Sequence, residues 1–227
     1  MKKGPSMLEQ RGPGARFKVG HCGKRVWIAD GHRVLDVGSG HVPFPRADTL
    51  LEKYPDQDAE RSGVGIDRAD PRLVIGDATA MPFADKEFDY VVASHIAEHV
   101  DDPAAFFAEL SRVARAGYIE TPGWLGDLVL REPFHPWRIR RRGSVLEFRW
   151  VKGDRGLGWV SDLMYAAVYL GLERSGHRIP VARGRIARAV SQAWRYGFAG
   201  ILRLPIIVDA FYTRFEWHGT IPNRRAD

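Results

Sequence analysis

The chain has 227 residues, of which 44% are hydrophobic and 11% aromatic, so it can bury a substantial core and is not a disordered segment. Its single cysteine, Cys22, excludes an internal disulfide and a cysteine-rich metal site. The charge is uneven, because residues 1–125 carry 16 Lys/Arg against 19 Asp/Glu, whereas residues 126–227 carry 18 against 9.

The basic second half is compatible with a solvated surface, or with binding of nucleic acid, an anionic membrane or a phosphorylated substrate. The N-terminal segment is basic but lacks the apolar run of a signal peptide. The apolar stretch 189–211 contains Arg195, Arg203 and Pro205, which disfavour a transmembrane span. We expect a cytoplasmic protein in which this stretch packs on the sheet as a helix, with contact to lipid or to a lipid-linked acceptor as the alternative.

From about residue 32, short β-branched apolar runs alternate with turn signals, which predicts a parallel sheet in an α/β fold. The clearest helix is predicted at 103–115, where Asp102 can cap the first turn, Pro103 suits the first position and Gly117 ends the helix. The predicted strands are RVLDVG (33–38), TLLEKY (49–54), RLVIGD (72–77), FDYVVAS (88–94), GYIETP (117–122), SVLEFRWV (144–151) and FYTRFEW (211–217).

The first of these strands runs into the turn Gly38-Ser39-Gly40, where missing Cβ atoms let the backbone approach a ligand closely. A dinucleotide-binding turn would need a third glycine, but Pro43 and Pro45 follow instead, so binding of NAD is disfavoured. S-adenosylmethionine lacks a pyrophosphate and needs only an open turn, an acid for the ribose and a polar clamp for the adenine.

Two segments, VLDVGSG and GDATAMPFADKEFDYVVASHIAEHVDDPAAFFAELSRVARAGYIETP, closely resemble the class I S-adenosylmethionine-dependent methyltransferases of the "type 11" group. The resemblance covers about residues 33–123. It implies a Rossmann-like α/β fold whose mostly parallel sheet carries helices on both faces and a C-terminal antiparallel strand. We expect a single methyltransferase domain over 1–227, with a cofactor-binding core at about 27–124 and an acceptor-side elaboration at about 125–227.

The resemblance also implies the residues that bind the cofactor. The turn after the first strand would surround the methionine and ribose, the turn after RLVIGD would clamp the adenine, and the end of FDYVVAS would lie beside the methyl group. These residues are Asp36, Gly38, Ser39 and Gly40, then Asp77 and Ala78, then Ser94 and His95.

Two acids compete for the ribose hydroxyls. Asp67, in GVGID, looks more like the usual motif, but it precedes Asp77 by too few residues to fit a helix and another strand. Glu52, in TLLEKY, would end the second strand if the first helix is reduced to the prolyl loop HVPFPRAD. We favour Glu52 and keep Asp67 as the alternative.

His135 is the first candidate for a general base, since it lies beside Trp137 and an arginine run in the region where the family varies for its acceptors. His99 and His95 are the reserve candidates, although each is also compatible with a structural role. No spacing of His, Asp and Glu predicts a metal site, so no metal should be required.

The function that we expect is O-methylation of a sugar, a glycoconjugate or another small-molecule hydroxyl. An RNA or DNA methyltransferase is a lesser alternative, because the segment RIRRRGSVLEFRW interleaves arginines with aromatics but the pocket motif of exocyclic-amine methylation is missing. A module that binds the cofactor without catalysis is the third reading. The sequence gives no indication of the oligomeric state.

Overall fold

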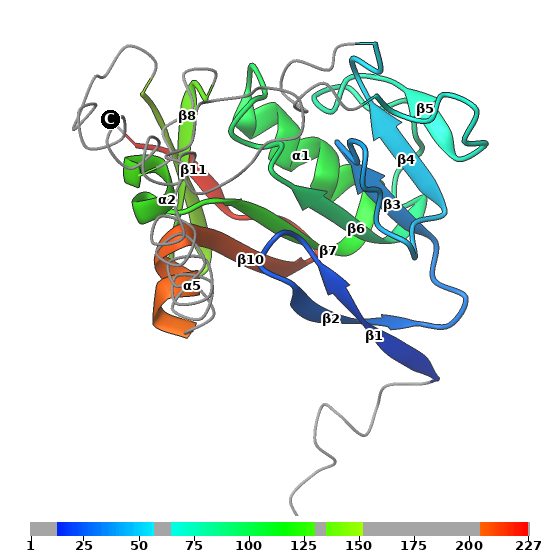
Figure 1. The fold of residues 1–227 in the computed structure, drawn as a ribbon, viewed down its shortest axis with the longest axis horizontal. Coiled ribbons are helices and arrows are strands. Elements are labelled where there is room, and N and C mark those ends of the chain that lie inside the picture. The colour runs from blue at the N-terminus through cyan, green and yellow to red at the C-terminus, as the bar shows by residue number, and fades with distance from the viewer. Residues whose placement is uncertain (1–12, 57–64, 130–134, 152–204, 227) are drawn as a thin grey trace, which may run out of the picture.

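The computed structural model describes residues 13–56, 65–129, 135–151 and 205–226 (Figure 1). Its centre is a six-stranded sheet in the order β10-β7-β6-β3-β4-β5, in which only β10 runs antiparallel to its neighbour. This confirms the mostly parallel α/β sheet and its C-terminal antiparallel strand. The strands are β3 (Val34–Val37), β4 (Thr49–Glu52), β5 (Leu73–Ile75), β6 (Phe88–Ser94), β7 (Ala114–Pro122) and β10 (Tyr212–His218).

Helix α1 (Pro103–Val113) connects β6 to β7 and begins as the sequence predicts. The Asp102 carboxylate accepts hydrogen bonds from the backbone N–H groups of Ala104 and Ala105, and Pro103 opens the first turn. The predicted end is wrong, however, because Ala114 is already extended and pairs with β6. Gly117 lies within β7, where a Cβ would be 2.6 Å from Val91, so this glycine serves strand packing rather than helix termination.

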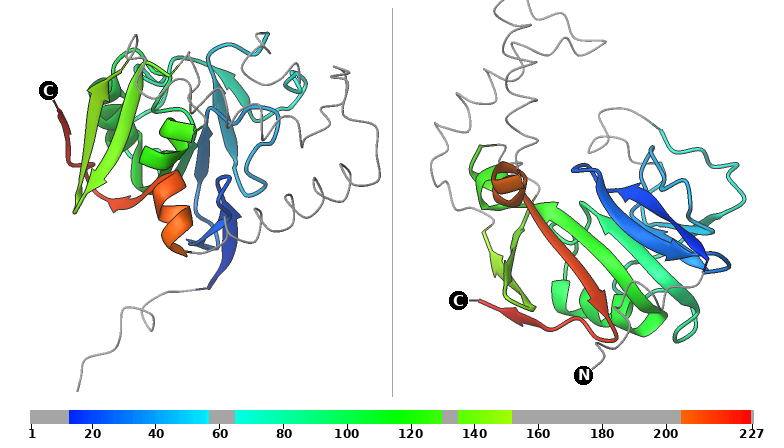
Figure 2. Two further views of the ribbon diagram at one scale, coloured as in Figure 1. Left: turned by 60° about the vertical axis from the view of Figure 1, so that its left-hand side comes forward. Right: turned by 90° about the horizontal axis from the view of Figure 1, so that it is seen from below.

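The two faces of the sheet are covered differently (Figure 2). One face packs against α1 and against a three-stranded sheet formed by β8 (Trp137–Arg142), β9 (Val145–Trp150) and β11 (Asn223–Arg225). The other face packs against the hairpin of β1 (Gly14–Val19) and β2 (Lys24–Ala29).

The sequence predicts helices on both faces of the sheet. In the described residues, however, a hairpin and not a helix covers the second face. The connection between β3 and β4 is a loop rather than a helix, because Pro43 and Pro45 cannot sit inside one. Phe44 from this loop is buried and meets Phe17 of the hairpin edge to face, with ring centroids 6.1 Å apart.

Two short helices, α2 (Trp124–Val129) and α5 (Pro205–Phe211), contact each other beside the β7 and β10 edge (Figure 1). Helix α5 is the described part of the apolar stretch 189–211, whose remainder lies outside the described residues. Among the described helices, none is long and apolar enough to cross a membrane.

Loss of the helix cap should destabilise the protein measurably. The Asp102→Ala variant leaves two N–H groups at the start of α1 without their acceptor, so its free energy of unfolding should fall by about 0.5–2 kcal/mol. Urea unfolding followed by circular dichroism measures this difference. The Asp102→Asn variant keeps a capping oxygen and is the control; equal stabilities for the Ala and Asn variants would contradict the capping role.

Candidate active site

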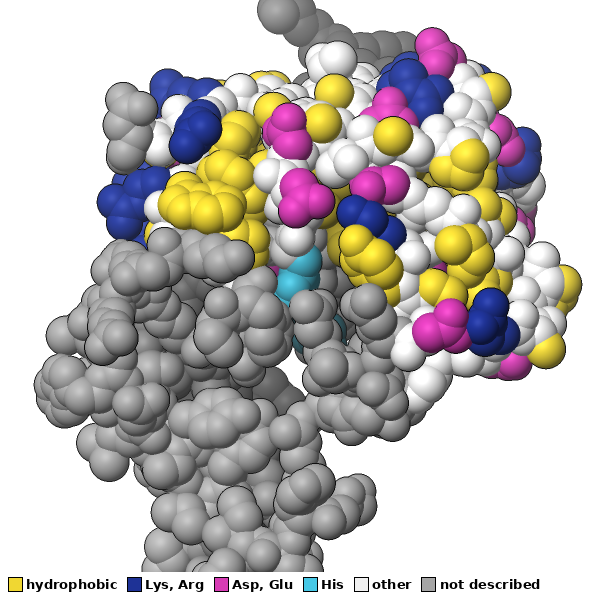
Figure 3. Space-filling view, turned by 90° about the horizontal axis from the view of Figure 1, so that it is seen from above, with side chains coloured by type: hydrophobic (Ala, Val, Ile, Leu, Met, Phe, Trp, Pro, Cys, Tyr) yellow, Lys and Arg dark blue, Asp and Glu magenta, His cyan; other side chains and the backbone are white. Residues whose placement is uncertain are grey.

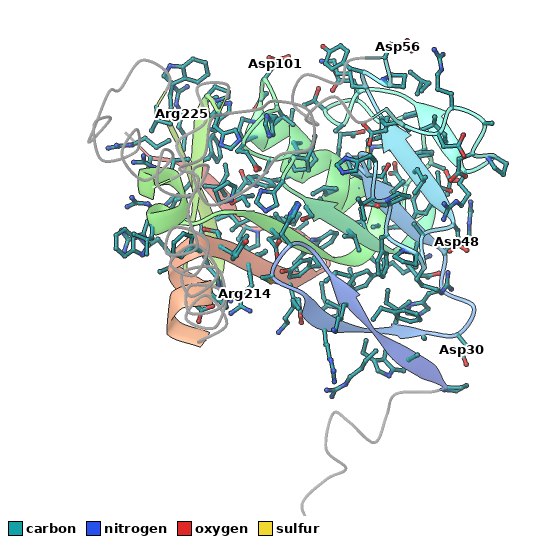
Figure 4. All side chains as sticks on the ribbon, in the orientation of Figure 1. Asp30, Asp48, Asp56, Asp101, Arg214 and Arg225 are labelled. Atoms are coloured by element: carbon teal, nitrogen blue, oxygen red, sulfur yellow. The ribbon has the colours of Figure 1, made fainter. Side chains whose placement is uncertain are left out.

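A cavity of about 360 Å³ lies at the carboxyl ends of the central strands. In parallel sheets this edge is where ligands bind, because the loops that follow the strands converge there. The lining comes from residues 37–40, 51–54, 76–78 and 95–101. Figure 3 looks down on this edge and shows a histidine side chain in a hollow between acidic, basic and hydrophobic side chains, and Figure 4 labels Asp101 at the same edge.

The glycine turn after β3 forms one wall of the cavity. Gly38 and Gly40 both have left-handed backbones, with φ of 67° and 59°. The Gly38 N–H donates to the Leu51 carbonyl at 2.8 Å, and a Cβ on Gly38 would lie only 3.0 Å from the Ile96 side chain. The turn thus presents bare backbone to the cavity, and larger residues would close this approach.

Glu52 ends β4 and lines the cavity with a side chain that is 7% exposed. Its Oε1 accepts a hydrogen bond from the Ser39 hydroxyl at 3.0 Å and another from the Gly40 N–H, so it holds the glycine turn against the second strand. Asp67, the competing acid, is exposed, accepts from the Ala69 N–H at 3.0 Å and does not line the cavity.

Asp36 lies in β3 but turns away from the cavity. Its carboxylate is 5% exposed and accepts a hydrogen bond from the Phe44 N–H at 2.7 Å. Burial raises the pKa of Asp36 to about 7, and the neighbouring charge of Glu52 adds to this effect. The side chain therefore supports the loop after β3 and does not touch the space where a ligand would bind.

Asp77 and Ala78 form the rim opposite the glycine turn. Oδ1 of Asp77 accepts from the Thr79 N–H at 2.8 Å and from the Thr79 hydroxyl at 2.7 Å, while Oδ2 pairs with the Lys53 ammonium at 2.8 Å. The hydrogen bond from Lys53 is the main reason why the pKa of Asp77 falls to about 2, so this carboxylate is ionised at neutral pH. Lys53 also lies 3.7 Å from Asp101 across the cavity mouth.

His95 follows β6 with a left-handed backbone, at φ of 57°, and its ring lies between two buried carboxylates. Its Nδ1 is 3.1 Å from Glu98 Oε1, and its Nε2 is 3.6 Å from Glu120 Oε1. Burial alone would lower the pKa of His95, but the two carboxylates outweigh it and raise the pKa to about 9. A protonated imidazole therefore faces the cavity at neutral pH.

His99 lines the cavity and packs edge to face with His135, with ring centroids 4.6 Å apart. His135 does not itself line the cavity, and burial lowers the pKa of its imidazole to about 4. At neutral pH His135 is therefore uncharged, in contrast to His95. Two of the three predicted catalytic histidines thus lie at the cavity, and the third lies directly behind one of them.

The residues that were predicted to bind the cofactor or to take part in catalysis divide into two groups. Seven of the candidate site residues line the cavity: Gly38, Gly40, Glu52, Asp77, Ala78, His95 and His99. The other five do not: Asp36, Ser39, Asp67, Ser94 and His135. Sequence reasoning missed the cavity residue Lys53 and the buried carboxylates Glu98 and Glu120, although the last two fall within the motifs that carry the resemblance.

Folding also brings together two groups of side chains that could ligate a metal ion. One is His21, His95 and Glu120, and the other is Glu98, His99 and His135. Within each group the ligand atoms lie within 4.8 Å of one another. Each group joins residues from distant parts of the chain, and the sequence alone predicts no metal site.

The buried Asp36 carboxyl should give the protein a distinct pH dependence. Its pKa is raised from 3.8 to about 7 on folding, so its stabilising contribution is complete below pH 3.8 and is lost as the pH rises through about 7. The Asp36→Asn variant keeps an acceptor for the Phe44 N–H without a charge. Between these pH values the wild type should therefore lose free energy of unfolding relative to this variant.

Urea unfolding of both proteins across this pH range tests the shift, and parallel stability curves would contradict it.

Comparison with known proteins finds methyltransferases that are similar to part of this chain. A family model described as "Methyltransferase domain" matches residues 35–119. A demethylmenaquinone methyltransferase of Renibacterium salmoninarum is 39% identical over 115 residues, which cover 49% of this chain and 45% of that protein. An uncharacterized methyltransferase of a Mycobacterium species (strain KMS) is 35% identical over 104 residues, which cover 42% of this chain and 41% of the relative.

The chain thus spans less than half the length of these relatives. Among solved structures, the PH0226 protein of Pyrococcus horikoshii is 19% identical with a TM-score of 0.34, over 58% of this chain and 72% of that one. The match at 35–119 covers the glycine turn, the Asp77 rim and the histidine loop of the cavity. In this region the chain is therefore similar to S-adenosylmethionine-dependent methyltransferases.

Proposed function

We propose that this protein transfers the methyl group of S-adenosylmethionine to a hydroxyl of a small-molecule acceptor, and that the cavity described above binds the cofactor. One observation carries the proposal. Three features at the ends of β3, β4 and β5 surround the same cavity: the open glycine turn, the Glu52 carboxylate and the Asp77-Ala78 rim. The match of residues 35–119 to the methyltransferase-domain model supports the same chemistry.

The residues fit the parts of the cofactor. The bare turn at Gly38 and Gly40 leaves room for the methionine end, and Glu52 at the end of the second strand is placed to accept from ribose hydroxyls. The ionised Asp77 carboxylate can accept from the amine of adenine. When bound, S-adenosylmethionine supplies an electrophilic methyl group on a sulfonium.

The protonation states of the histidines indicate which of them can accept the proton of the acceptor hydroxyl. In the transfer, an oxygen–carbon bond forms as the carbon–sulfur bond breaks, and the hydroxyl proton must leave. His95 is already protonated at neutral pH and cannot take this proton. His99 and His135 are the groups that remain, with His99 at the cavity and the neutral His135 behind it. We keep His135 as the general base, and the proton would reach it by way of His99, which lies between His135 and the cavity.

A sugar or glycoconjugate hydroxyl is our first candidate acceptor, since the segments SHIAEHV and GYIETP, with the later FHPW and SVLEF, resemble methyltransferases commonly met beside glycan-biosynthesis enzymes. A quinone-related acceptor is the second candidate, because three of the similar proteins are demethylmenaquinone methyltransferases. One comes from Renibacterium salmoninarum and two come from the genus Roseiflexus. Both candidates place an acceptor oxygen or carbon against the same methyl group.

The purified protein should bind S-adenosylmethionine and S-adenosylhomocysteine with one-to-one stoichiometry in a calorimeter. The Asp77→Ala variant should bind them more weakly by roughly 1–3 kcal/mol, because the adenine amine loses its acceptor. The Asp85→Ala variant, which removes an exposed acid outside the cavity, is the matched control. Wild-type affinity in Asp77→Ala would remove Asp77 from the cofactor site.

The two candidate ribose acids can be separated in the same assay. Glu52→Ala should weaken cofactor binding strongly, since it removes both the proposed ribose acceptor and the support of the glycine turn. Asp67→Ala should bind like the wild type, because Asp67 does not line the cavity. The reverse ranking would reassign the ribose contact to the segment around Asp67.

An acceptor screen with labelled cofactor should identify turnover on one acceptor class among sugars, glycoconjugates, reduced quinones and RNA. With the acceptor so found, His135→Ala should lower turnover at least about tenfold with cofactor affinity nearly unchanged, because a base adds little to binding of the ground state. His218→Ala, an exposed histidine away from the cavity, is the control. Unchanged turnover in His135→Ala would exclude it from the mechanism.

Cofactor binding without turnover on any acceptor in the screen would instead favour the non-catalytic module.

A further inference from the structure

A second polar site adjoins the cofactor cavity, formed by Glu98, His99 and His135. We propose that these three side chains bind a divalent transition-metal ion, and that the ion takes the acceptor oxygen as a further ligand. The role of the ion toward the acceptor rests on the proposed methyl transfer, whereas the binding of the ion rests on the geometry alone. The site is built from two distant segments, the loop after β6 and the approach to β8.

The donor set is one that first-row metal ions favour. Two imidazole nitrogens and one carboxylate oxygen lie within 4.8 Å of one another, close enough for a single ion to contact all three after small side-chain adjustments. Two histidines and one carboxylate on one side of an ion leave other positions open, and zinc, iron, manganese and cobalt all accept such ligands.

Glu98 supplies an independent observation. Its side chain is only 1% exposed, and its Oε1 accepts a hydrogen bond from His95 at 3.1 Å. Its other oxygen, Oε2, is buried and accepts no hydrogen bond from the described residues. A buried carboxylate oxygen without a donor is costly, and a bound cation would satisfy it. His95 would then orient the Glu98 carboxylate from behind, as residues around metal ligands commonly do.

The location connects the ion to the reaction. His99 lines the cofactor cavity, so an ion held by its imidazole lies at the side where an acceptor must approach the methyl group. A metal ion lowers the pKa of a hydroxyl bound to it. With the ion bound, the hydroxyl proton would pass to solvent and His135 would serve as a ligand; without the ion, His135 keeps the role of the base proposed above.

The other group, His21, His95 and Glu120, is less suited to an ion. Glu120 already accepts hydrogen bonds from the backbone of His21 at 2.6 Å, from the Tyr118 hydroxyl at 2.6 Å and from the Cys22 thiol at 2.8 Å. An ion there would have to displace contacts that anchor the hairpin turn. At Glu98 a buried oxygen is still available.

The test is a cobalt titration of the full chain after removal of metal by a chelator, without cofactor, followed by visible absorption and calorimetry. The wild type should bind one equivalent of Co²⁺, and Zn²⁺ should displace it. His135→Ala and Glu98→Gln should each lower the affinity at least about tenfold, since loss of a direct ligand should cost no less than loss of a supporting residue. His218→Ala should bind as the wild type does.

Three outcomes would overturn the proposal: no saturable Co²⁺ binding, unchanged affinity in His135→Ala and Glu98→Gln when circular dichroism shows both to be folded, or loss of binding in His21→Ala alone. If either variant fails to fold, His99→Ala takes its place. Binding of S-adenosylhomocysteine to the same metal-free protein is measured separately. Its success without Co²⁺ binding overturns only the metal site, and its failure with Co²⁺ binding overturns only the proposed cofactor site.

Discussion

The buried carboxylate of Glu120 is the interaction on which this side of the molecule depends. It lies in β7 with no exposed surface, and its charge is compensated by His95 at 3.6 Å and by donors from Tyr118 and the hairpin turn at His21 and Cys22. These neighbours lower the pKa of Glu120 to about 2 against the opposing effect of burial. Removing one member of such a buried pair typically costs about 3–5 kcal/mol, because the other charge is left uncompensated.

The same carboxylate couples the N-terminal hairpin to the cavity. Gly20 in the hairpin turn has φ of 66°, and a Cβ there would lie 2.4 Å from Glu120 Oε2, so the turn approaches the carboxylate closely only because this residue is glycine. His95, held in its left-handed conformation between Glu120 and Glu98, forms part of the cavity lining. The hairpin that covers the second face of the sheet is therefore also a support of the site.

Motifs with local causes were predictable from the sequence. The strands of the parallel sheet, the Asp102 cap and the cavity residues Gly38 and Asp77 depend on residues that are neighbours along the chain. The attachment of the hairpin β1–β2 to Glu120, the packing of β8 on β10 and the support of Glu52 by Ser39 depend on contacts between segments that are not neighbours along the chain. Gly117 shows where prediction from local sequence fails. A glycine after a helix predicts the end of that helix, but Gly117 is needed because Val91 of β6 and Trp217 pack closely against it.

The position of β10 has a consequence for the order in which the fold can form. This strand pairs with β7 along seven residues, from Tyr212 opposite Pro122 to His218 opposite Ala116, although residues 123–211 separate the two strands. During synthesis, β7 must therefore emerge long before its outer neighbour exists and remain an open sheet edge meanwhile. Pairing of strands so far apart in the sequence is a slow step, and until it occurs the nascent chain is exposed to pairing with other strands.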